Sequence, residues 1–196
     1  ASDECYSEIY PDEAAPPPGL LQAAADLGYG DYRHCLCFHS LSKRSNLPGM
    51  RSGFVAGDAR WIERFRRYRT YHGCAMPPRH QIASEWVWSD EQHVRANRAR
   101  YREKFAAVTP ILASVLAAPS PDAGFYLWPE TPIDDETFAR QPLQHAGDKV
   151  LPGRYLARDT AAGNPGAHRI RHALVAELGQ CVEAAERIAH ALKSVG

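Results

Sequence analysis

The chain has 196 residues, 44% of them hydrophobic, and its 23 Lys and Arg balance its 23 Asp and Glu. A chain of this length can bury about 70% of its extended-chain surface, so one or two globular domains are expected. The zero net charge argues against broad attraction to nucleic acid or to an anionic membrane surface, and no apolar run approaches the roughly 20 residues of a membrane helix. Five cysteines, an odd number, favour reduced thiols and a cytoplasmic location.

Short strands alternate with helical segments in the first part of the chain, which indicates an α/β layer. Residues 1–10 are typical of a strand end that runs into a loop, and residues 12–19 contain the helix-breaking sequence Ala-Ala-Pro-Pro-Pro. We expect a short helix over 20–27, a buried strand that is apolar on both faces over 34–39, and a second strand over 51–57.

A helix with an aromatic face is expected next. Trp61, Phe65 and Tyr68 recur at helical spacing, so this face should pack inward while the neighbouring arginines face solvent. A further helix is expected over 81–88.

The sequence Ser89-x-x-Gln92 has the form of a capping box that opens a long helix, within which Pro110 should introduce a bend. Three further strands are expected, over 125–128, 149–151 and 169–175. A short helix is expected over 134–139, with Pro142 ending it early, and a last helix begins near Glu177. This part therefore predicts a small α+β unit attached to the long helix.

The segment 38–51 contains the side chains best suited to catalysis or ligand binding. It combines a strand end, the hydroxyls of Ser40 and Ser42, the amine of Lys43, a Gly/Pro turn and Arg51. A desolvated lysine is a nucleophile toward carbonyls, and hydroxyls beside a guanidinium suit a phosphate group. The alternative interpretation is a polar surface loop.

Ser40 and Lys43 also have the spacing of the serine acylase motif of penicillin-binding proteins. That chemistry requires later Ser-Asp-Asn and Lys-Thr-Gly sequences, and neither occurs in this chain. The acylase interpretation is therefore excluded.

Three motifs taken together resemble the pyridoxal-phosphate-dependent aminotransferases of fold type I, classes I and II. They are Asp3-Glu4-Cys5-Tyr6, Ser40-Leu41-Ser42-Lys43, and an arginine, Arg51, eight residues beyond the lysine. Residues 150–153 and 169–174 resemble the small-domain segments that contact substrate. The strings 40–58, 68–77 and 131–135 look closest to the succinyldiaminopimelate transaminases of bacterial lysine biosynthesis.

The resemblance implies a fold. Residues 1–92 would be the C-terminal part of the large pyridoxal-phosphate-binding domain, with a mixed, mostly parallel sheet flanked by helices. Residues 93–196 would be the small α+β domain together with the long linking helix. Because members of the family are about twice this long, we expect an N-terminal half of the same enzyme to complete the chain, and the resemblance also implies a homodimer.

The resemblance also implies roles for individual residues. Lys43 would bind pyridoxal 5'-phosphate as a Schiff base and then move the substrate Cα proton. Asp3 would keep the pyridine nitrogen protonated, and Tyr6 would donate to the phenolic oxygen of the ring. The phosphate would be bound by Arg51 and Ser40, with Ser42 a weaker candidate.

Arg171 is the expected ligand of the substrate α-carboxylate, through a bidentate guanidinium pair. Arg169, two residues earlier on the same strand face, is the rival for this role. The family usually has an apolar residue after this arginine, whereas this chain has His172.

The function implied is amino-group transfer between an amino acid and a 2-oxo acid, with N-succinyl-diaminopimelate and glutamate/2-oxoglutarate as the expected pair. One alternative is another enzyme on the same scaffold, either a different amino-acid transaminase or a carbon–sulfur lyase. The other is a catalytically incomplete fragment that acts only as a structural or dimerisation unit.

Two other patterns receive structural interpretations. Cys35, Cys37 and His39 share a strand face, but same-face neighbours lie about 6.6 Å apart, which is too far for comfortable tetrahedral metal coordination. The arginines at 60, 64, 66, 67 and 69 are more typical of a solvated helix face than of a nucleic-acid site. Residues 71–76 are either a turn or a segment that reaches the neighbouring subunit's substrate pocket.

Overall fold

The computed structural model describes residues 1–73 and 75–195 and divides into two compact units, Ala1–Ala99 and Arg100–Gly196. The expected boundary between a large domain 1–92 and a small domain 93–196 stays a prediction. Within the described residues, no helix is both long enough and apolar enough to cross a membrane.

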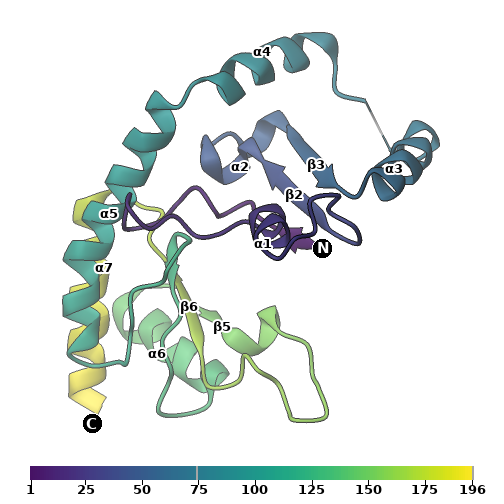
Figure 1. Ribbon diagram of the computed structural model, residues 1–196. Coiled ribbons are helices and arrows are strands. Elements are labelled where there is room, and N and C mark those ends of the chain that lie inside the picture. Colours follow the sequence, from purple (N-terminus) through teal and green to yellow (C-terminus); the bar gives the residue numbers. More distant parts are fainter. Residues whose placement is uncertain (74, 196) are drawn as a thin grey trace. The chain divides into compact units, whose positions relative to one another are not determined.

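A mixed three-stranded sheet organises the first unit (Figure 1). Its strands, in the order β1-β2-β3, are β1 (Ser2–Asp3), β2 (Leu36–Ser40) and β3 (Gly53–Gly57). β1 runs parallel to β2, with Asp3 opposite Phe38, whereas β3 is antiparallel to β2, with Gly53 opposite Ser40. The mixed α/β architecture expected from the sequence is therefore present.

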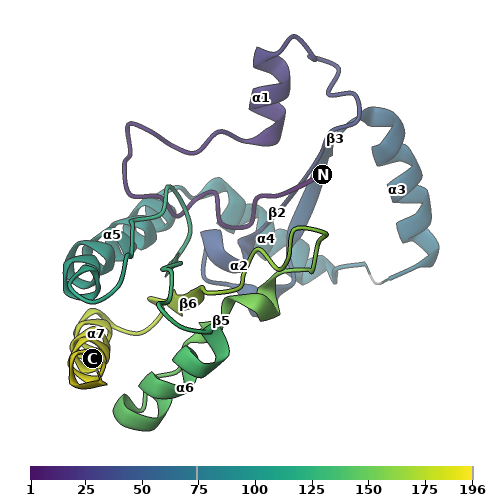
Figure 2. The same cartoon turned by 90° about the horizontal axis from the view of Figure 1, so that it is seen from below.

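Short helices surround this sheet. They are α1 (Leu20–Asp26), α2 (Leu41–Arg44), α3 (Ala59–Tyr71), α4 (Pro78–Ser89) and the 3₁₀ helix Pro48–Met50. Helix α1 contacts β2, α3 contacts β3 and α4 contacts α2, as the two views in Figures 1 and 2 allow the reader to follow. α2 and the 3₁₀ helix form the connection between β2 and β3, which contains Ser42, Lys43 and Arg51.

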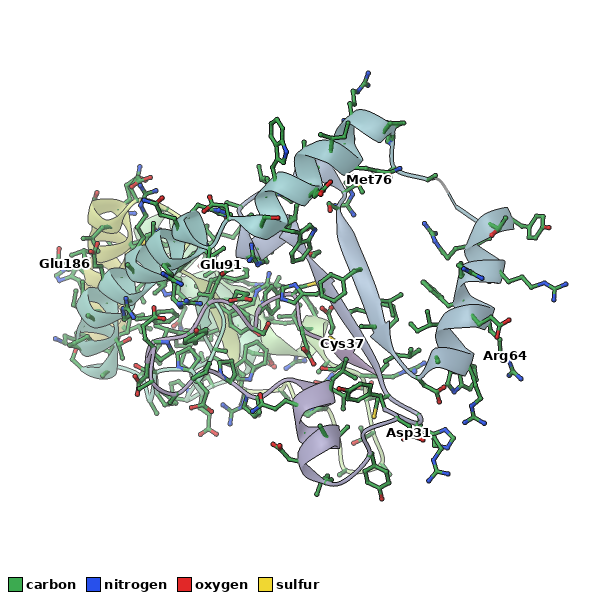
Figure 3. The ribbon with its side chains drawn as sticks, turned by 45° about the horizontal axis from the view of Figure 1, so that its top comes forward. Asp31, Cys37, Arg64, Met76, Glu91 and Glu186 are labelled. Atoms are coloured by element: carbon green, nitrogen blue, oxygen red, sulfur yellow. The ribbon has the colours of Figure 1, made fainter. Side chains whose placement is uncertain are left out.

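The aromatic face of α3 does not pack inward as expected. Phe65 makes an edge-to-face contact with Phe38, with ring centroids 6.2 Å apart, but Trp61 and Tyr68 are 46% and 57% exposed. Arg64 projects away from the sheet (Figure 3), as expected for the arginines of this helix. The prediction was wrong for most of this face because α3 packs mainly against the edge strand β3, and only Phe65 reaches β2.

Strand β2 also differs from its prediction as a fully buried strand. Only Cys37 is buried, and the other four residues are partly exposed. Three strands and their short helices cover less of each sheet face than two complete helical layers would.

The long helix α5 (Gln92–Ala113) begins without the predicted capping box. Ser89 instead donates its hydroxyl to the Glu85 carbonyl in the last turn of α4, at 2.8 Å. The carboxylate of Asp90 accepts the backbone N–H of Gln92 at 2.8 Å. Asp90 therefore caps α5, because its carboxylate lies two residues before the first helical N–H.

The second unit combines an antiparallel sheet with helices, as expected for an α+β unit. Its strands, in the order β4-β6-β5, are β4 (Tyr126–Leu127), β5 (Leu151–Pro152) and β6 (Ile170–Ala173). The remaining elements are α6 (Asp135–Ala146), the 3₁₀ helix Gly153–Leu156 and α7 (Leu178–Val195). The end of α5 and α7 lie side by side in both views (Figures 1 and 2) and share the core of this unit.

Helix α6 continues through residue 142 to Ala146, so the prediction that Pro142 ends it early was wrong. A proline removes one backbone hydrogen bond from a helix. Here the helix is held by Phe138, which is 1% exposed in the core, and by its contact with α7.

At the start of α6, the buried Asp135 binds Arg154, with Oδ1 2.8 Å from Nε.

Candidate active site

The parallel pairing of β1 and β2 brings two of the motifs to one edge of the sheet. Asp3 is the last residue of β1 and Ser40 the last residue of β2. The Glu4 N–H donates to the Phe38 carbonyl at 2.8 Å, so the pairing continues to the ends of both strands. The carboxyl ends of neighbouring parallel strands are where α/β proteins place their ligands.

The segment from Ser40 to Lys43 forms one short helical turn rather than a loop. Ser40 precedes α2, and its Oγ accepts the Ser42 N–H at 3.3 Å. The Leu41 N–H donates to the Ser52 carbonyl at 3.1 Å, and the Lys43 carbonyl accepts from Asn97 Nδ2 at 3.4 Å. Lys43 therefore lies on a turn tied to the start of β3 and to α5.

Cys5 connects Asp3 with Ser40. Its backbone N–H donates to Asp3 Oδ1 at 3.1 Å, and the Ser40 hydroxyl donates to Cys5 Sγ at 3.3 Å. Hydrogen bonds from the thiol and the N–H of Cys5 hold the pKa of the Asp3 carboxyl below its usual range. Asp3 is therefore an anion at neutral pH.

Lys43 belongs to the same neighbourhood, and Tyr6 lies in the turn that follows β1. The positive charge of Lys43 acts on the Cys5 sulfur, where it opposes the rise in pKa that burial and the Asp3 carboxylate cause. Tyr6 is half-buried in the turn after β1, where its carbonyl accepts the Ile9 N–H at 3.0 Å. Asp3, Cys5, Ser40 and Lys43 are thus brought together from two segments more than 30 residues apart.

Arg51 follows the 3₁₀ helix in a left-handed conformation, with φ of 53°. This region is uncommon for residues other than glycine and often marks functional positions. The guanidinium is exposed, and its Nη1 donates to the Pro48 carbonyl at 2.8 Å. Two residues later, a Cβ on Gly53 would lie 2.6 Å from the His39 carbonyl, so glycine is needed for the close approach of β3 to the end of β2.

An aromatic group that the sequence motifs did not predict lies next to the end of β2. The His39 ring lies against Phe54 and Trp88, with centroids 5.6 and 5.5 Å away. His39 Nδ1 accepts the Ser40 N–H at 2.8 Å, and Trp88 Nε1 donates to Ser52 Oγ at 3.3 Å. The position of His39 directly before the serine-lysine motif was a usable signal, whereas Trp88 comes from a helix distant in sequence.

Cys37 on β2 and Cys35 just before it are free cysteines. Cys37 is buried, and its burial raises its pKa to about 12. In the described parts of the chain, no three His, Cys, Asp or Glu side chains are grouped so that they could hold a metal ion.

The segment 71–76, a candidate for substrate specificity, begins at Tyr71, the last residue of α3, which is 86% exposed. Cys74 in this segment lies outside the described residues.

The two candidate carboxylate ligands belong to the second unit, and their surroundings differ. Arg169 binds the Glu130 carboxylate at 2.5 Å and the Trp128 carbonyl at 3.2 Å. Arg171, on β6, lies over the Tyr126 ring at 5.7 Å from its centroid. Its partly exposed guanidinium makes no ion pair with any carboxylate of the described residues.

Known proteins resemble this chain over nearly its whole length. The model of the family "Aminotransferase class I and II" matches residues 1–188. A probable aminotransferase of Mycobacterium tuberculosis is 36% identical over 178 residues, which are 89% of this chain and 40% of that protein. An LL-diaminopimelate aminotransferase of Nitratidesulfovibrio vulgaris is 28% identical, over 97% of this chain and 47% of that protein.

Solved structures agree with these relatives. An aminotransferase from Neisseria meningitidis is 56% identical with a TM-score of 0.91, over 96% of this chain and 48% of the solved chain. A probable N-succinyldiaminopimelate aminotransferase from Thermus thermophilus is 27% identical with a TM-score of 0.80, over the same shares. The chain thus spans about half the length of its relatives. On the family match and these structural likenesses, the chain belongs to the class I and II aminotransferases, pyridoxal-phosphate-dependent enzymes of fold type I.

Proposed function

We propose that the full-length protein that carries this chain is a transaminase of diaminopimelate metabolism, acting on N-succinyl-diaminopimelate with glutamate/2-oxoglutarate. The observation that carries the proposal is the parallel register of β1 and β2, which sets the Asp3 carboxylate beside the turn of Ser40 and Lys43. The diaminopimelate-type substrate is supported by the two relatives whose names include that compound.

The residues present fit the family's cofactor. Asp3 carries a negative charge at neutral pH, which suits a protonated pyridine nitrogen. The exposed Arg51 guanidinium and the Ser42 hydroxyl offer donors for a phosphate dianion, and the Ser40 O–H, which here donates to Cys5 Sγ, would add another by turning toward the phosphate. When bound, pyridoxal phosphate supplies a carbonyl carbon for the amino group and a ring that withdraws electrons from the substrate Cα.

The chain's own residues would then perform binding and proton transfer. Lys43 would take the proton from the substrate Cα and return it, a role that commonly contributes 10²–10⁴-fold, in round numbers, to a rate. Asp3 would hold the proton on the pyridine nitrogen, and Tyr6 would donate to the phenolic oxygen. Arg171 would hold the substrate α-carboxylate, since no carboxylate of the described residues already occupies its guanidinium.

We also propose that a further half of the enzyme completes the site and that the complete protein is a homodimer. The exposed apolar side chains of the first unit support the first part, because large exposed apolar groups usually mark interaction surfaces. They lie on β3, α3 and α4: Phe54, Trp61, Tyr68, Tyr71, Ile82 and Trp86.

Two experiments on the full-length protein test the proposal. Borohydride reduction with pyridoxal phosphate should attach the cofactor to the peptide that contains Lys43, and Lys43→Ala should abolish this attachment and lower the transamination rate about a thousandfold. Lys149→Ala, at an exposed lysine of the second unit, is the matched control and should change neither.

Substrate assays separate the alternatives. Consumption of N-succinyl-LL-diaminopimelate with 2-oxoglutarate at a higher kcat/KM than other amino acids supports the proposed substrate. Release of pyruvate and ammonia from cystathionine would instead identify a carbon–sulfur lyase. Absence of any cofactor attachment at Lys43 would leave only a structural or dimerisation role.

A further inference from the structure

Cys5 occupies the point where the two cofactor-binding motifs meet. It lies in the turn that follows β1, half-buried, with its N–H on the Asp3 carboxylate at 3.1 Å. From the other strand, the Ser40 hydroxyl reaches its sulfur at 3.3 Å, a hydrogen-bonding distance for sulfur. One residue thus contacts the expected partner of the ring nitrogen through its backbone N–H and an expected partner of the phosphate through its sulfur.

The surroundings of Cys5 keep its sulfur protonated. Burial and the Asp3 carboxylate raise the pKa of the thiol, although Ser40 and the charge of Lys43 act in the opposite direction. A neutral thiol can donate a hydrogen bond to a carboxylate and accept one from a hydroxyl at the same time. Neither function requires the sulfur to react as a nucleophile.

The exposure of Asp3 makes such a contact useful. Its carboxylate is solvent-exposed at the end of a two-residue strand, so its orientation depends on local hydrogen bonds. Ser40 is similarly placed at the end of β2, with its hydroxyl shared between the Ser42 N–H and the Cys5 sulfur.

We propose that Cys5 is a positioning residue that fixes Asp3 and Ser40 relative to each other and so presets the pyridine and phosphate contacts of the cofactor. The inference rests on the proposed function. The residue acts through its two neighbours and takes part in no bond-making step. Alanine at position 5 keeps the backbone N–H bond to Asp3 but removes the sulfur and its hydrogen bonds to Ser40 and Asp3, whereas a serine hydroxyl preserves a side-chain donor and acceptor.

The test measures cofactor affinity of the full-length apoprotein by fluorescence titration with pyridoxal phosphate. Because one hydrogen bond is worth about 0.5–1.5 kcal/mol, Cys5→Ala should raise the dissociation constant roughly threefold to tenfold, and Cys5→Ser should restore most of the affinity. Cys5→Ala should also shift the pH at which the absorbance of the bound cofactor changes, because Asp3 loses a hydrogen bond that lowers its pKa. Cys35→Ala, at a half-buried cysteine outside this cluster, is the control and should change neither.

A double-mutant cycle sharpens the result. If Cys5 acts through Ser40, the effects of Cys5→Ala and Ser40→Ala on affinity will be less than additive. An unchanged dissociation constant and pH profile in Cys5→Ala, with normal binding by the parent protein, would overturn the inference and leave the proposed function intact. If the parent protein does not bind pyridoxal phosphate at all, the proposed function fails as well.

Discussion

Trp88 on α4 donates its indole N–H to the hydroxyl of Ser52, 3.3 Å away at the start of β3. The same ring lies 5.2 Å from the Phe54 centroid and 5.2 Å from the Arg44 guanidinium carbon, and His39 contacts its edge. Ser52 is buried, and its carbonyl accepts the N–H of Leu41 at the start of the lysine-bearing turn. Through its contacts with Ser52, Phe54 and Arg44, Trp88 therefore stabilises the segment that runs from Lys43 to Arg51.

This contact predicts graded losses of stability. In urea unfolding of the full-length protein, Trp88→Phe should cost about 1 kcal/mol, because it removes one hydrogen bond and keeps most of the ring. Trp88→Ala should cost about 3 kcal/mol through lost packing. Trp86→Phe, on the same helix but 74% exposed, should lie within about 0.5 kcal/mol of the parent. Equal effects at positions 86 and 88 would contradict the assigned role.

Asp58 predicts an acid-dependent loss of stability. Its carboxylate accepts the His34 and Arg60 N–H groups, each at 2.9 Å, and these bonds lower its pKa from 3.8 to about 2. Because the pKa is lower in the folded state, the stabilisation is complete above about pH 4 and disappears as the pH falls toward 2. Asp58→Asn should lower the melting temperature at pH 7 and reduce its dependence on pH between 4 and 2.

The control for this prediction is Asp26→Asn, at an exposed position on the last turn of α1. Its melting temperature should follow that of the parent at every pH. A parent and an Asp58→Asn protein with parallel pH profiles would show that the carboxylate is not stabilised in this way.

The sequence predicted the order of elements well and their packing less well. Local patterns were sufficient for α1, β2, β3 and α7, since turn residues and apolar spacing mark their ends. The inward face of α3 was wrong because burial depends on what lies opposite Trp61 and Tyr68, which spacing along one helix does not reveal. The cap of α5 was wrong because Ser89 and Asp90 compete for one helix start, and the Ser89 hydroxyl bonds backward within α4.

For the site as well, the motifs indicated which residues belong together but not the contacts between them. The motifs predicted that Asp3 and Ser40 belong to one site, and the parallel pairing of β1 and β2 brings these two residues to the same edge of the sheet. The contact between Cys5 and Ser40 was missed because it joins residues 35 positions apart and depends on strand register. The roles assigned to Asp3, Tyr6, Ser40, Ser42, Lys43, Arg51 and Arg171 stay predictions for the experiments.

His172 predicts a second, distinct dependence on pH. It lies on β6 opposite Leu127, and burial lowers its pKa below the usual 6.5. Protonation is therefore easier in the unfolded state, so stability should fall as the pH drops below about 6.5. His172→Leu should flatten the melting temperature between pH 6.5 and 5, whereas His168→Gln, at an exposed histidine, should keep the parent's slope. An unchanged slope in His172→Leu would assign the effect to another group.

Arg171 and Arg169 can be separated by kinetics of the full-length enzyme. Arg169 already binds the Glu130 carboxylate and the Trp128 carbonyl, so it would have to give up these contacts to hold a substrate. Arg171 stacks on Tyr126 and makes no ion pair with the described carboxylates, so its guanidinium can accept a substrate carboxylate without that loss. The α-carboxylate should therefore be bound by Arg171.

Arg171→Ala should lower kcat/KM about a hundredfold or more, since removing one partner of a hydrogen-bonded charge pair costs about 2–5 kcal/mol. Arg171→Lys should recover only part of this loss, because lysine cannot form the bidentate pair. Arg169→Ala should lower kcat/KM less than about tenfold, the cost of an exposed ion pair being about 0–1 kcal/mol. If Arg169→Ala lowers kcat/KM more than Arg171→Ala does, at equal melting temperatures, then Arg169 rather than Arg171 binds the substrate α-carboxylate.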